Sequence, residues 1–594
     1  MPDSQDNDKA ASSLQMEATE QAPDSIQSQQ GTTVYPSSAR LLAIGIGLSL
    51  AVICSNLVRA SFIHSSPLKY LQSIDDVDNN HFLYSQDRSI LGVATPRITA
   101  EFHSLDDIGW YGSVYLLTSC CSQLIFGKIY TRYSIKWVFI AALGIFEVGS
   151  ILCAAAPNSD GLIVGRAIAG LGATGISTGA PKIISSIMPV HQRPKYTAMI
   201  GACMGITLVV APFLGGVFTD KLTWRWCFWI NLPLGGLTVL IVLLLVRIPQ
   251  QPKMAGTSGR PTLDKLHLPG VVLLLASTVS LLLALQWGGS KYAWGSWRCI
   301  LLLCIFGVCG LAWCWLQYLQ GDEATVPPRL LKMRSVVAAM WFAFCLFGIM
   351  FIQSYYVPIW FQALKNESAY HSGINLLAMS VAMTMAFILT GVLTTVTGYY
   401  VPSMIAGSVI SAISGGLMME YDAHTSTGYW MASLILAGLG FGLGAQQCMM
   451  IPQTMLKGTD IALGTSVIMF AETLSGAVFL AVCESLFQTR LVRELQRLAP
   501  TANPQVVIAK GAVNLKSSMT ELYSPEVAAG VMQAYSGALQ PVWIVAVVLG
   551  ALSLIGAVFT EWVSVKKDKK KDQDDAGKEV KSAPVEEEDS VQVA

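Results

Sequence analysis

The chain has 594 residues, of which 53% are hydrophobic and only 13% are charged. An ordinary soluble protein carries about 25% charged residues. The formal net charge is zero, so the charge balance does not favour a nucleic-acid partner. These figures exclude a soluble enzyme or a nucleic-acid-binding protein and predict an all-α, multi-pass membrane protein.

Membrane crossings are predicted wherever about 20 mostly apolar residues follow one another. An irregular first crossing starts near Leu41. Thirteen further stretches qualify: 110–129, 137–156, 162–181, 197–218, 228–247, 268–286, 298–318, 336–360, 372–396, 402–419, 429–451, 462–487 and 541–562. Fourteen crossings place both ends of the chain on one side of the membrane.

The loop charges predict which side that is. With cytosolic termini, the inner loops carry 12 Lys and Arg residues and the short outer loops carry six, which agrees with the excess of basic residues found in cytosolic loops. Residues 1–38 are polar, show no signal peptide and are expected to be a disordered cytosolic tail. Residues 563–594 form a second, charged tail on the same side.

Residues 488–540 are predicted to form a long outer loop. Two amphipathic pieces lie in it, one with Leu491, Leu495 and Leu498 on one helical face and one with Ala528, Met532 and Tyr535. We expect short helices that lie at the outer membrane interface. A docking surface for a partner is the alternative.

Arg166 lies inside an otherwise apolar helix, next to Gly165 and Ala167. An arginine in the middle of a membrane helix costs about 2.5–3.5 kcal/mol, so it is expected to face protein or water and to have a partner. The alternative is a structural arginine that extends to the membrane surface. We favour a buried coupling role, with Asp87, Glu147 and Gln123 as candidate partners.

The stretch 201–216 (GACMGITLVVAPFLGG) has small residues four positions apart. Small residues at this spacing allow another helix to approach closely, and a proline inside the stretch permits a bend. Many helix pairs pack in this way without a functional reason. The residues concerned are Gly201, Gly205, Pro212, Gly215 and Gly216.

Several other polar residues lie inside predicted crossings. Each of the carboxylates is able to carry a proton, although a hydrogen-bonded structural role is an equal alternative. The glutamines are candidates for the lining of a cavity. These residues are Glu147, Glu472 and Glu484, and Gln353, Gln446 and Gln447.

Motifs for enzymatic chemistry are not found in the sequence. The 13 cysteines form no CxxC pair, and the chain has neither a GxxxxGK[ST] phosphate loop nor an HExxH motif. We therefore expect no enzymatic activity, no metal and no cofactor.

Five stretches together resemble the fourteen-helix drug:proton antiporters of the major facilitator superfamily, in their fungal toxin-efflux branch. They resemble, in order, the loop between helices 2 and 3, the helix 4 arginine motif, the antiporter motif of helix 5, the segment before helix 6 and the helix 9 signature. These stretches are 127–132 (GKIYTR) with Lys136, 162–170, 201–216, 222–233 (LTWRWCFWINLP) and 355–362 (YYVPIWFQ).

The resemblance implies a major facilitator fold with 14 transmembrane helices. It places one six-helix bundle at 39–247, helices 7 and 8 as an inserted pair within 248–335, and a second bundle at 336–562. Substrate is expected between the bundles, which expose it alternately to the two sides.

The implied function is the efflux of small amphipathic organic compounds, such as toxins, secondary metabolites or drugs, in exchange for protons. We expect a monomer in the plasma membrane, driven by the proton gradient, with the vacuolar membrane as the alternative location. The alternative function is the transport of a nutrient or a basic amino acid by the same fold. Arg166 is implied as the centre of proton coupling, and Gly127, Lys128, Arg132 and Lys136 as a gating loop.

The chain also departs from the family pattern. Thr131 stands where the broader superfamily has an aspartate, and Ala211 replaces the glycine before Pro212. The pattern of helix 1 is split, because residues 48–57 join smoothly onto residues 87–96 if 58–86 are left out. We interpret 58–86 as an aberrant insert from a translated intron, with a genuine insert as the alternative. Asp87, the likeliest coupling carboxylate, leaves the transport path if the insert is genuine.

Overall fold

The computed structural model describes residues 44–45, 47–49, 51, 98, 101–102, 108–188, 190–203, 207, 222–246, 268–288, 292–367, 369–458, 460–504, 506–507 and 515–566. All of them belong to the unit 39–594. The tail 1–38, the predicted insert 58–86 and most of the tail 563–594 lie outside the described residues.

The first group of helices packs around an apolar core that includes Phe139, Phe146 and Ile176, each of them fully buried. Helix α6 begins where the side chain of Asn158 accepts a hydrogen bond from the Gly161 amide, which satisfies a free N–H of the first turn. The helices are α4 (Ile108–Arg132), α5 (Ile135–Ala154), α6 (Ser159–Ile187), η5 (Val190–Gln192), the helical residues 193–203, α8 (Trp226–Trp229) and α9 (Asn231–Leu245).

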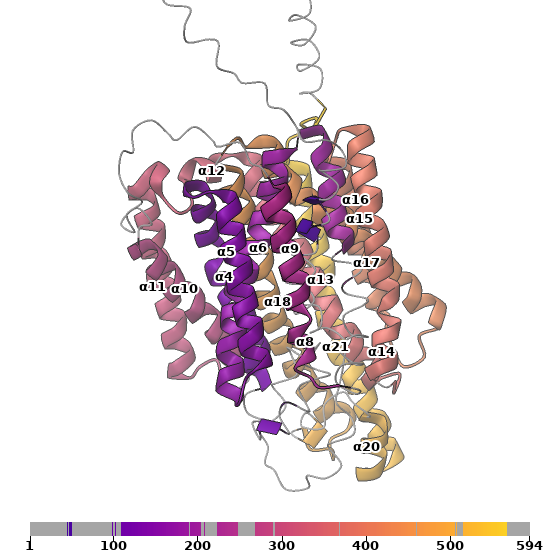
Figure 1. Ribbon diagram of the computed structural model, residues 1–594. Helices are drawn as coiled ribbons and strands as arrows, with labels where there is room; N and C mark the ends of the chain where they lie inside the picture. Colours follow the sequence, from indigo (N-terminus) through magenta and orange to yellow (C-terminus); the bar gives the residue numbers. More distant parts are fainter. Residues whose placement is uncertain are drawn as a thin grey trace, which may run out of the picture. The chain divides into compact units, whose positions relative to one another are not determined.

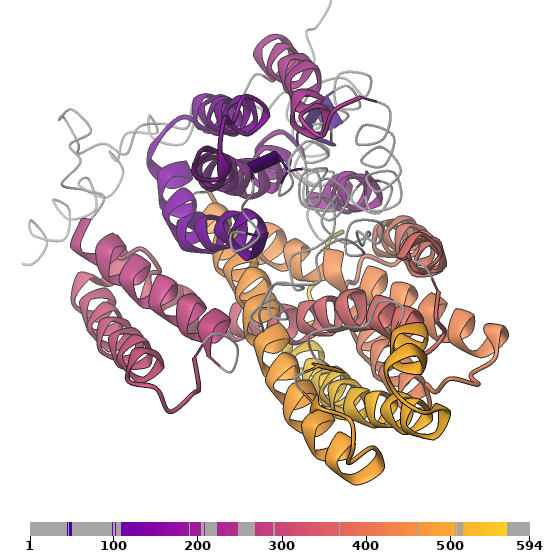
Figure 2. The same cartoon turned by 90° about the horizontal axis from the view of Figure 1, so that it is seen from below.

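Two helices, α10 (Leu268–Trp287) and α11 (Trp297–Gln320), pack against each other as a separate pair. Only 6% of the apolar window of α11 is buried, so most of its surface is left to face lipid. The pair is joined to the rest of the chain by η7 (Gly321–Glu323) and α12 (Pro328–Lys332). Figures 1 and 2 both show the pair at one side of the unit, next to α4 and α18.

The second group contains the larger core, in which Trp360, Trp543 and Tyr535 are almost completely buried. Helix α15 ends at Gly398, whose φ of +83° suits a residue without a Cβ. The helices are α13 (Arg334–Ala363), α14 (Ala369–Asn375), α15 (Leu377–Thr397), α16 (Val401–Met418), α17 (Thr427–Met455), α18 (Asp460–Leu498), α20 (Leu515–Leu522) and α21 (Pro525–Phe559).

Helices α18 and α21 are longer than the sequence predicts. At 1.5 Å per residue, the 39 residues of α18 extend about 58 Å, which exceeds the hydrocarbon thickness of about 30 Å. The two amphipathic pieces predicted as separate short helices are the ends of these long helices. Leu491, Leu495 and Tyr535 are nearly unexposed in the second core, so the apolar faces meet protein and the prediction of an interfacial position is wrong.

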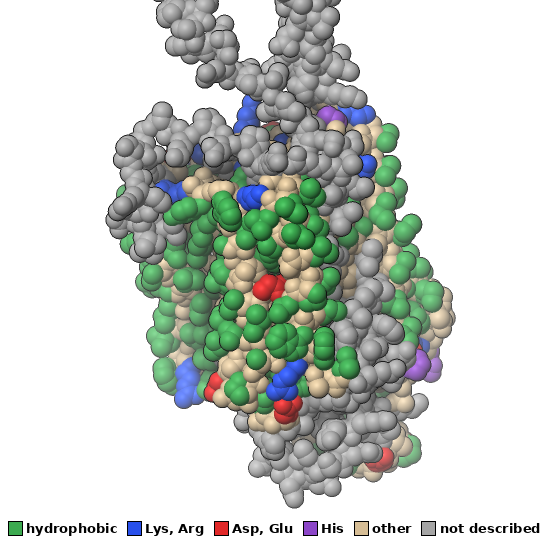
Figure 3. All heavy atoms as spheres, viewed as in Figure 1, with side chains coloured by type: hydrophobic (Ala, Val, Ile, Leu, Met, Phe, Trp, Pro, Cys, Tyr) green, Lys and Arg blue, Asp and Glu red, His purple; other side chains and the backbone are tan. Residues whose placement is uncertain are grey.

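Ten of the described helices are long and apolar enough to cross a membrane, and Pro269–Leu285 adds a shorter apolar helix. The predicted first and fifth crossings fall largely on residues outside the described ranges. Hydrophobic side chains cover the middle of the face drawn in Figure 3, apart from one acidic patch. Charged side chains gather toward the helix ends, as expected for a membrane protein.

The two groups of helices meet at one end of the unit, the end at which Arg132 ends α4 and Asp460 begins α18. We call it the Arg132 end, and the sequence predicts that it faces the cytosol. Here α18 packs along α4 and α6, and Ala462 of α18 lies in the core of the first group. Figure 2 shows α18 at the boundary between the groups.

Candidate functional site

Arg166 lies on α6 with its side chain enclosed by protein (0% exposed). Its Nε donates a hydrogen bond to the backbone carbonyl of Tyr111 at 2.7 Å. Its guanidinium carbon lies 4.4 Å from the centre of the Tyr115 ring. Both partners belong to α4 and lie one turn apart, so a single arginine ties α6 to α4 by a charge-assisted hydrogen bond and a cation–π contact.

The position of Arg166 along its helix is closer to the end opposite the Arg132 end. It lies seven residues from Ser159, which is about 10 Å along the axis. The Tyr111 hydroxyl donates to the Ser159 hydroxyl at 2.7 Å, a second link between α4 and α6 near this end. Complete burial at this depth argues against the alternative of an arginine that extends to the membrane surface.

Two of the predicted partners of Arg166 point elsewhere. Gln123 donates to the Thr178 hydroxyl at 2.8 Å and lies 3.2 Å from the sulfur of Met469 on α18. Glu147 faces α9, where a Cβ on Gly235 would lie 1.8 Å from its Oε1. The third predicted partner, Asp87, lies outside the described residues.

Glu147 instead belongs to a polar seam between α5 and α9. Both of its carboxylate oxygens are buried and have no hydrogen-bond partner in the part of the chain that the structure describes. One turn before Gly235 on α9, the side-chain amide of Asn231 donates to the Ser150 hydroxyl at 3.2 Å. The side-chain oxygen Oδ1 of Asn231 is buried without a partner among the same residues. Glu147 therefore makes no direct contact with Arg166 among the described residues. Its part in proton coupling stays a prediction.

Gly201 represents the predicted antiporter-motif stretch among the described residues, because Gly205, Pro212, Gly215 and Gly216 lie outside them. A Cβ at Gly201 would lie 2.0 Å from the side-chain nitrogen of Gln446 on α17. The predicted close approach of another helix is thus observed at this position, and the helix concerned belongs to the second group.

The predicted gating loop lies at the Arg132 end. A Cβ at Gly127 would lie 2.1 Å from the Ser466 hydroxyl on α18. Lys128 is 5% exposed and donates to the carbonyl of Ala324 at 2.9 Å. Lys136 donates to the carbonyls at the end of α9, at 2.7 and 3.0 Å, whereas Arg132 is exposed.

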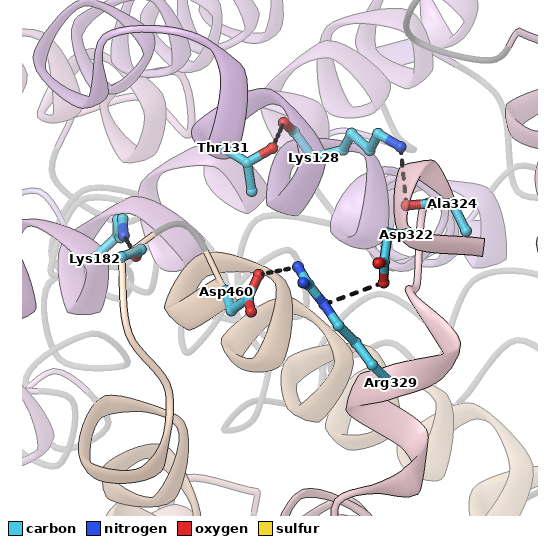
Figure 4. Close-up of polar contacts among 8 residues, drawn as sticks. Lys128, Thr131, Lys182, Asp322, Ala324, Arg329 and Asp460 are labelled. Atoms are coloured by element: carbon cyan, nitrogen blue, oxygen red, sulfur yellow. Dashed lines mark hydrogen bonds and ion pairs between the residues drawn. The ribbon is translucent and has the colours of Figure 1, made fainter. Parts of the chain in front are cut away.

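Several charged residues at this end were not identified as site candidates from the sequence. Lys182 donates to the carbonyl of Gly458, and Arg193 to that of Gln453, so that two cations of the first group reach the end of α17. Arg329 pairs with Asp460 at 2.8 Å. Figure 4 shows Lys182, Arg329 and Asp460 around the start of α18. A signal that could have identified Lys182 is the presence of a lysine within an apolar stretch.

The predicted cavity residues fall into two sets. Gln353 donates to the Ser414 hydroxyl at 3.2 Å and Gln447 to the Thr394 hydroxyl at 3.1 Å, so both tie helices within the second group together. Gln446 faces Gly201, and Glu472 lies 3.8 Å from the sulfur of Cys448.

Glu484 accepts from Tyr356 at 3.3 Å and from Gln488 at 2.6 Å. It lies 24 residues, about 36 Å along α18, from Asp460 at the Arg132 end.

Comparison with known proteins decides the family. The family model described as Major Facilitator Superfamily matches residues 80–480. The chain belongs to the major facilitator superfamily. "MFS-type efflux pump MFS1" of Arthroderma benhamiae is 44% identical over 503 residues, which are 85% of this chain and 93% of that relative. "Aspyridones efflux protein" of Neocamarosporium betae is 41% identical over 487 residues, 82% of this chain and 86% of that relative.

The fold agrees with this family. The crystal structure of the human organic anion transporter MFSD10 is similar with a TM-score of 0.51 at 12% identity, covering 89% of this chain and all of that one. The predicted all-α membrane fold of the superfamily and the resemblance to its efflux pumps are confirmed. The ten spans found among the described residues are consistent with the predicted fourteen helices.

Proposed function

We propose that this superfamily member exports small amphipathic organic compounds, such as toxins or secondary metabolites, in exchange for protons. It acts as a monomer in the plasma membrane with both termini in the cytosol, and the proton gradient supplies the energy without a cofactor or an enzymatic step. The names of the relatives support export, since both are called efflux proteins or efflux pumps and one is named for a metabolite.

The observation that carries proton exchange is the burial of Arg166 against Tyr111 and Tyr115. A guanidinium does not release its proton in proteins, so Arg166 does not itself carry the transported proton. Its fixed charge favours the ionised form of a carboxylate that approaches it and weakens proton binding there. Proton release and binding then follow the movement of such a carboxylate toward and away from Arg166. Asp87 remains the sequence-based candidate.

The substrate class follows from the surfaces at which the two groups of helices meet. Away from the cations of the Arg132 end, these contacts involve the polar side chains of Gln123 and Gln446 and apolar ones such as Met469. Sites of this composition bind ligands with a large apolar surface and a few hydrogen-bonding groups. Glu472 adds a carboxylate near Cys448, and we expect Glu472→Gln to alter which compounds are exported.

Transport into inside-out vesicles, driven by an imposed proton gradient, tests the proposal. Arg166→Lys keeps the charge but lacks the planar group that both contacts α4 and donates from Nε. Loss of the hydrogen bond that fixes this charge costs about 1.5–3 kcal/mol, so we expect gradient-driven transport to fall by about tenfold or more. Normal insertion and size-exclusion behaviour are the check on folding.

Arg298→Lys is the matched control. Arg298 also stacks on a tyrosine, 4.5 Å from the Tyr292 ring centre, but it is exposed at the start of α11. Unchanged transport by Arg166→Lys would refute the coupling role. Uptake into right-side-out vesicles, of a basic amino acid for example, would instead favour the nutrient transporter.

A further inference from the structure

The segment that connects the inserted pair to the second group is buried between α4, the inserted pair and α18. Ala324, Thr325 and Val326 are at most 5% exposed, although they belong to a connection and not to a helix. Val326 donates its amide to the side chain of Gln317 on α11 at 3.1 Å. Its own side chain packs in one apolar cluster with Leu124 of α4, Leu274 of α10 and Val467 of α18.

Polar contacts hold the same segment on both sides. Lys128 of α4 donates to the Ala324 carbonyl at 2.9 Å. Arg329 of α12 pairs with Asp460, in the first turn of α18, at 2.8 Å, and with Asp322 of η7 at 3.5 Å. Figure 4 shows Lys128 pointing toward Ala324, and Arg329 between Asp460 and Asp322.

The loop of α4 offers no carboxylate of its own at this position. The hydroxyl of Thr131 donates to the Lys128 carbonyl at 2.7 Å, so this hydrogen bond joins two residues of the same helix, α4. Ionic attachment at this point therefore depends on the connecting segment and on Asp460. The apolar and polar contacts both link α4 to α18 through residues that belong to neither group.

We propose that residues 322–329 are a latch that holds the Arg132 end closed, and that the inserted pair α10–α11 positions it. Access from this end requires α4 and α18 to separate, and Val326 then leaves either Leu124 or Val467. The inserted pair thus takes part in every transport cycle. This inference rests on the proposed transport by alternating exposure, and it assigns positioning roles to Val326, Arg329 and Asp460.

The reporter for opening is Ser466→Cys in a background where the 13 native cysteines are replaced. Ser466 is 1% exposed and faces Gly127, so a water-soluble maleimide reaches it only when the Arg132 end opens. The labelling rate of the reconstituted protein, measured without substrate or proton gradient, then follows the open population.

Val326→Ala removes two methyl groups from the contact that opening breaks, so we expect about tenfold faster labelling. The Arg329–Asp460 pair is partly exposed, and we expect Arg329→Asp or Asp460→Arg to raise the rate about two- to fivefold. The double variant with both changes restores the pair between positions 329 and 460 but not the contact with Asp322, so its rate should fall below that of either single variant. Arg490→Gln, which breaks the Arg490–Glu494 pair near the far end of α18, is the matched control and leaves the rate unchanged.

A lock provides the second measurement. A disulfide between Val326→Cys and Val467→Cys should abolish transport of a fluorescent amphipathic dye, and a reductant should restore it. The latch is refuted if the locked protein transports at the full rate, or if the three latch variants label no faster than Arg490→Gln. Because labelling needs no substrate or gradient, failure of the latch and failure of the efflux proposal are separate results.

Discussion

The seam between α5 and α6 permits a sharp prediction. A Cβ at Gly149 of α5 would lie 2.4 Å from the backbone nitrogen of Ala169 on α6, and 2.7 Å from its Cα. Backbone atoms do not swing aside as a side chain does, so Gly149→Ala forces the two helices apart by about 1 Å. Overpacking of this kind costs about 1–3 kcal/mol. At Gly144, in the same helix, a Cβ would meet nothing within 4 Å.

The assay is thermal unfolding of the purified protein in detergent, followed by size exclusion after heating. In units of 150–250 residues 1 kcal/mol shifts Tm by about 2–4 °C, and the shift is smaller in a unit as large as 39–594, so we expect Gly149→Ala to lower Tm by at most about 12 °C. Gly144→Ala should leave Tm unchanged or raise it slightly, because alanine favours a helix over glycine by up to about 1 kcal/mol. Equal Tm values for the two variants would refute the close packing of α5 on α6.

Two further predictions concern the second core and the loops outside the membrane. Trp360 is fully buried, and the centre of its ring lies 4.3 Å from that of Tyr421. Trp360→Ala should therefore lower stability by about 3–5 kcal/mol, as measured by thermal unfolding. Trp315 on α11 is 65% exposed, so Trp315→Ala should change stability little. Partial burial acts to raise the pKa of Glu101, but hydrogen bonds from Trp224 and Arg225 and the charge of Arg225 lower it below its usual value of 4.5. A lowered pKa stabilises the fold above pH 4.5, and this stability is lost as the pH falls through the folded-state pKa. We therefore expect the parent to lose at most about 1 kcal/mol of stability in this way and Glu101→Gln to lack that loss. An identical dependence of stability on pH in parent and variant would contradict this prediction.

The existence of the membrane helices could be predicted because each needs only a run of apolar residues. Their ends could not be, because Leu491 and Leu495 form the same amphipathic pattern whether their face meets a membrane surface or another helix. In this chain it meets the second core. The sequence pattern fixes the presence of an apolar face, and the tertiary structure decides what covers it.

The candidate site was predictable to the same limited extent. The burial of Arg166 followed from the cost of a charge in hydrocarbon, but its observed contacts on α4 include a backbone carbonyl and a tyrosine ring. Every residue has a carbonyl, so no sequence signal marks the one at Tyr111. Gln353 and Gln447 were assigned to a cavity because they are polar, but polar side chains equally serve to join helices inside a group, as both do here.

The chemistry of the Arg132 end suits a contact that opens repeatedly. Lys128, Lys182 and Arg193 of the first group each donate to a backbone carbonyl beyond it, at Ala324, Gly458 and Gln453. A hydrogen bond from a charged group contributes about 1.5–3 kcal/mol, and water replaces the carbonyl when the contact breaks. A buried ion pair would leave two uncompensated charges if water did not reach both. Alternating exposure requires two states within a few kcal/mol of each other. Donation from cations to carbonyls meets this requirement, because the acceptor has no charge to strand in the open state.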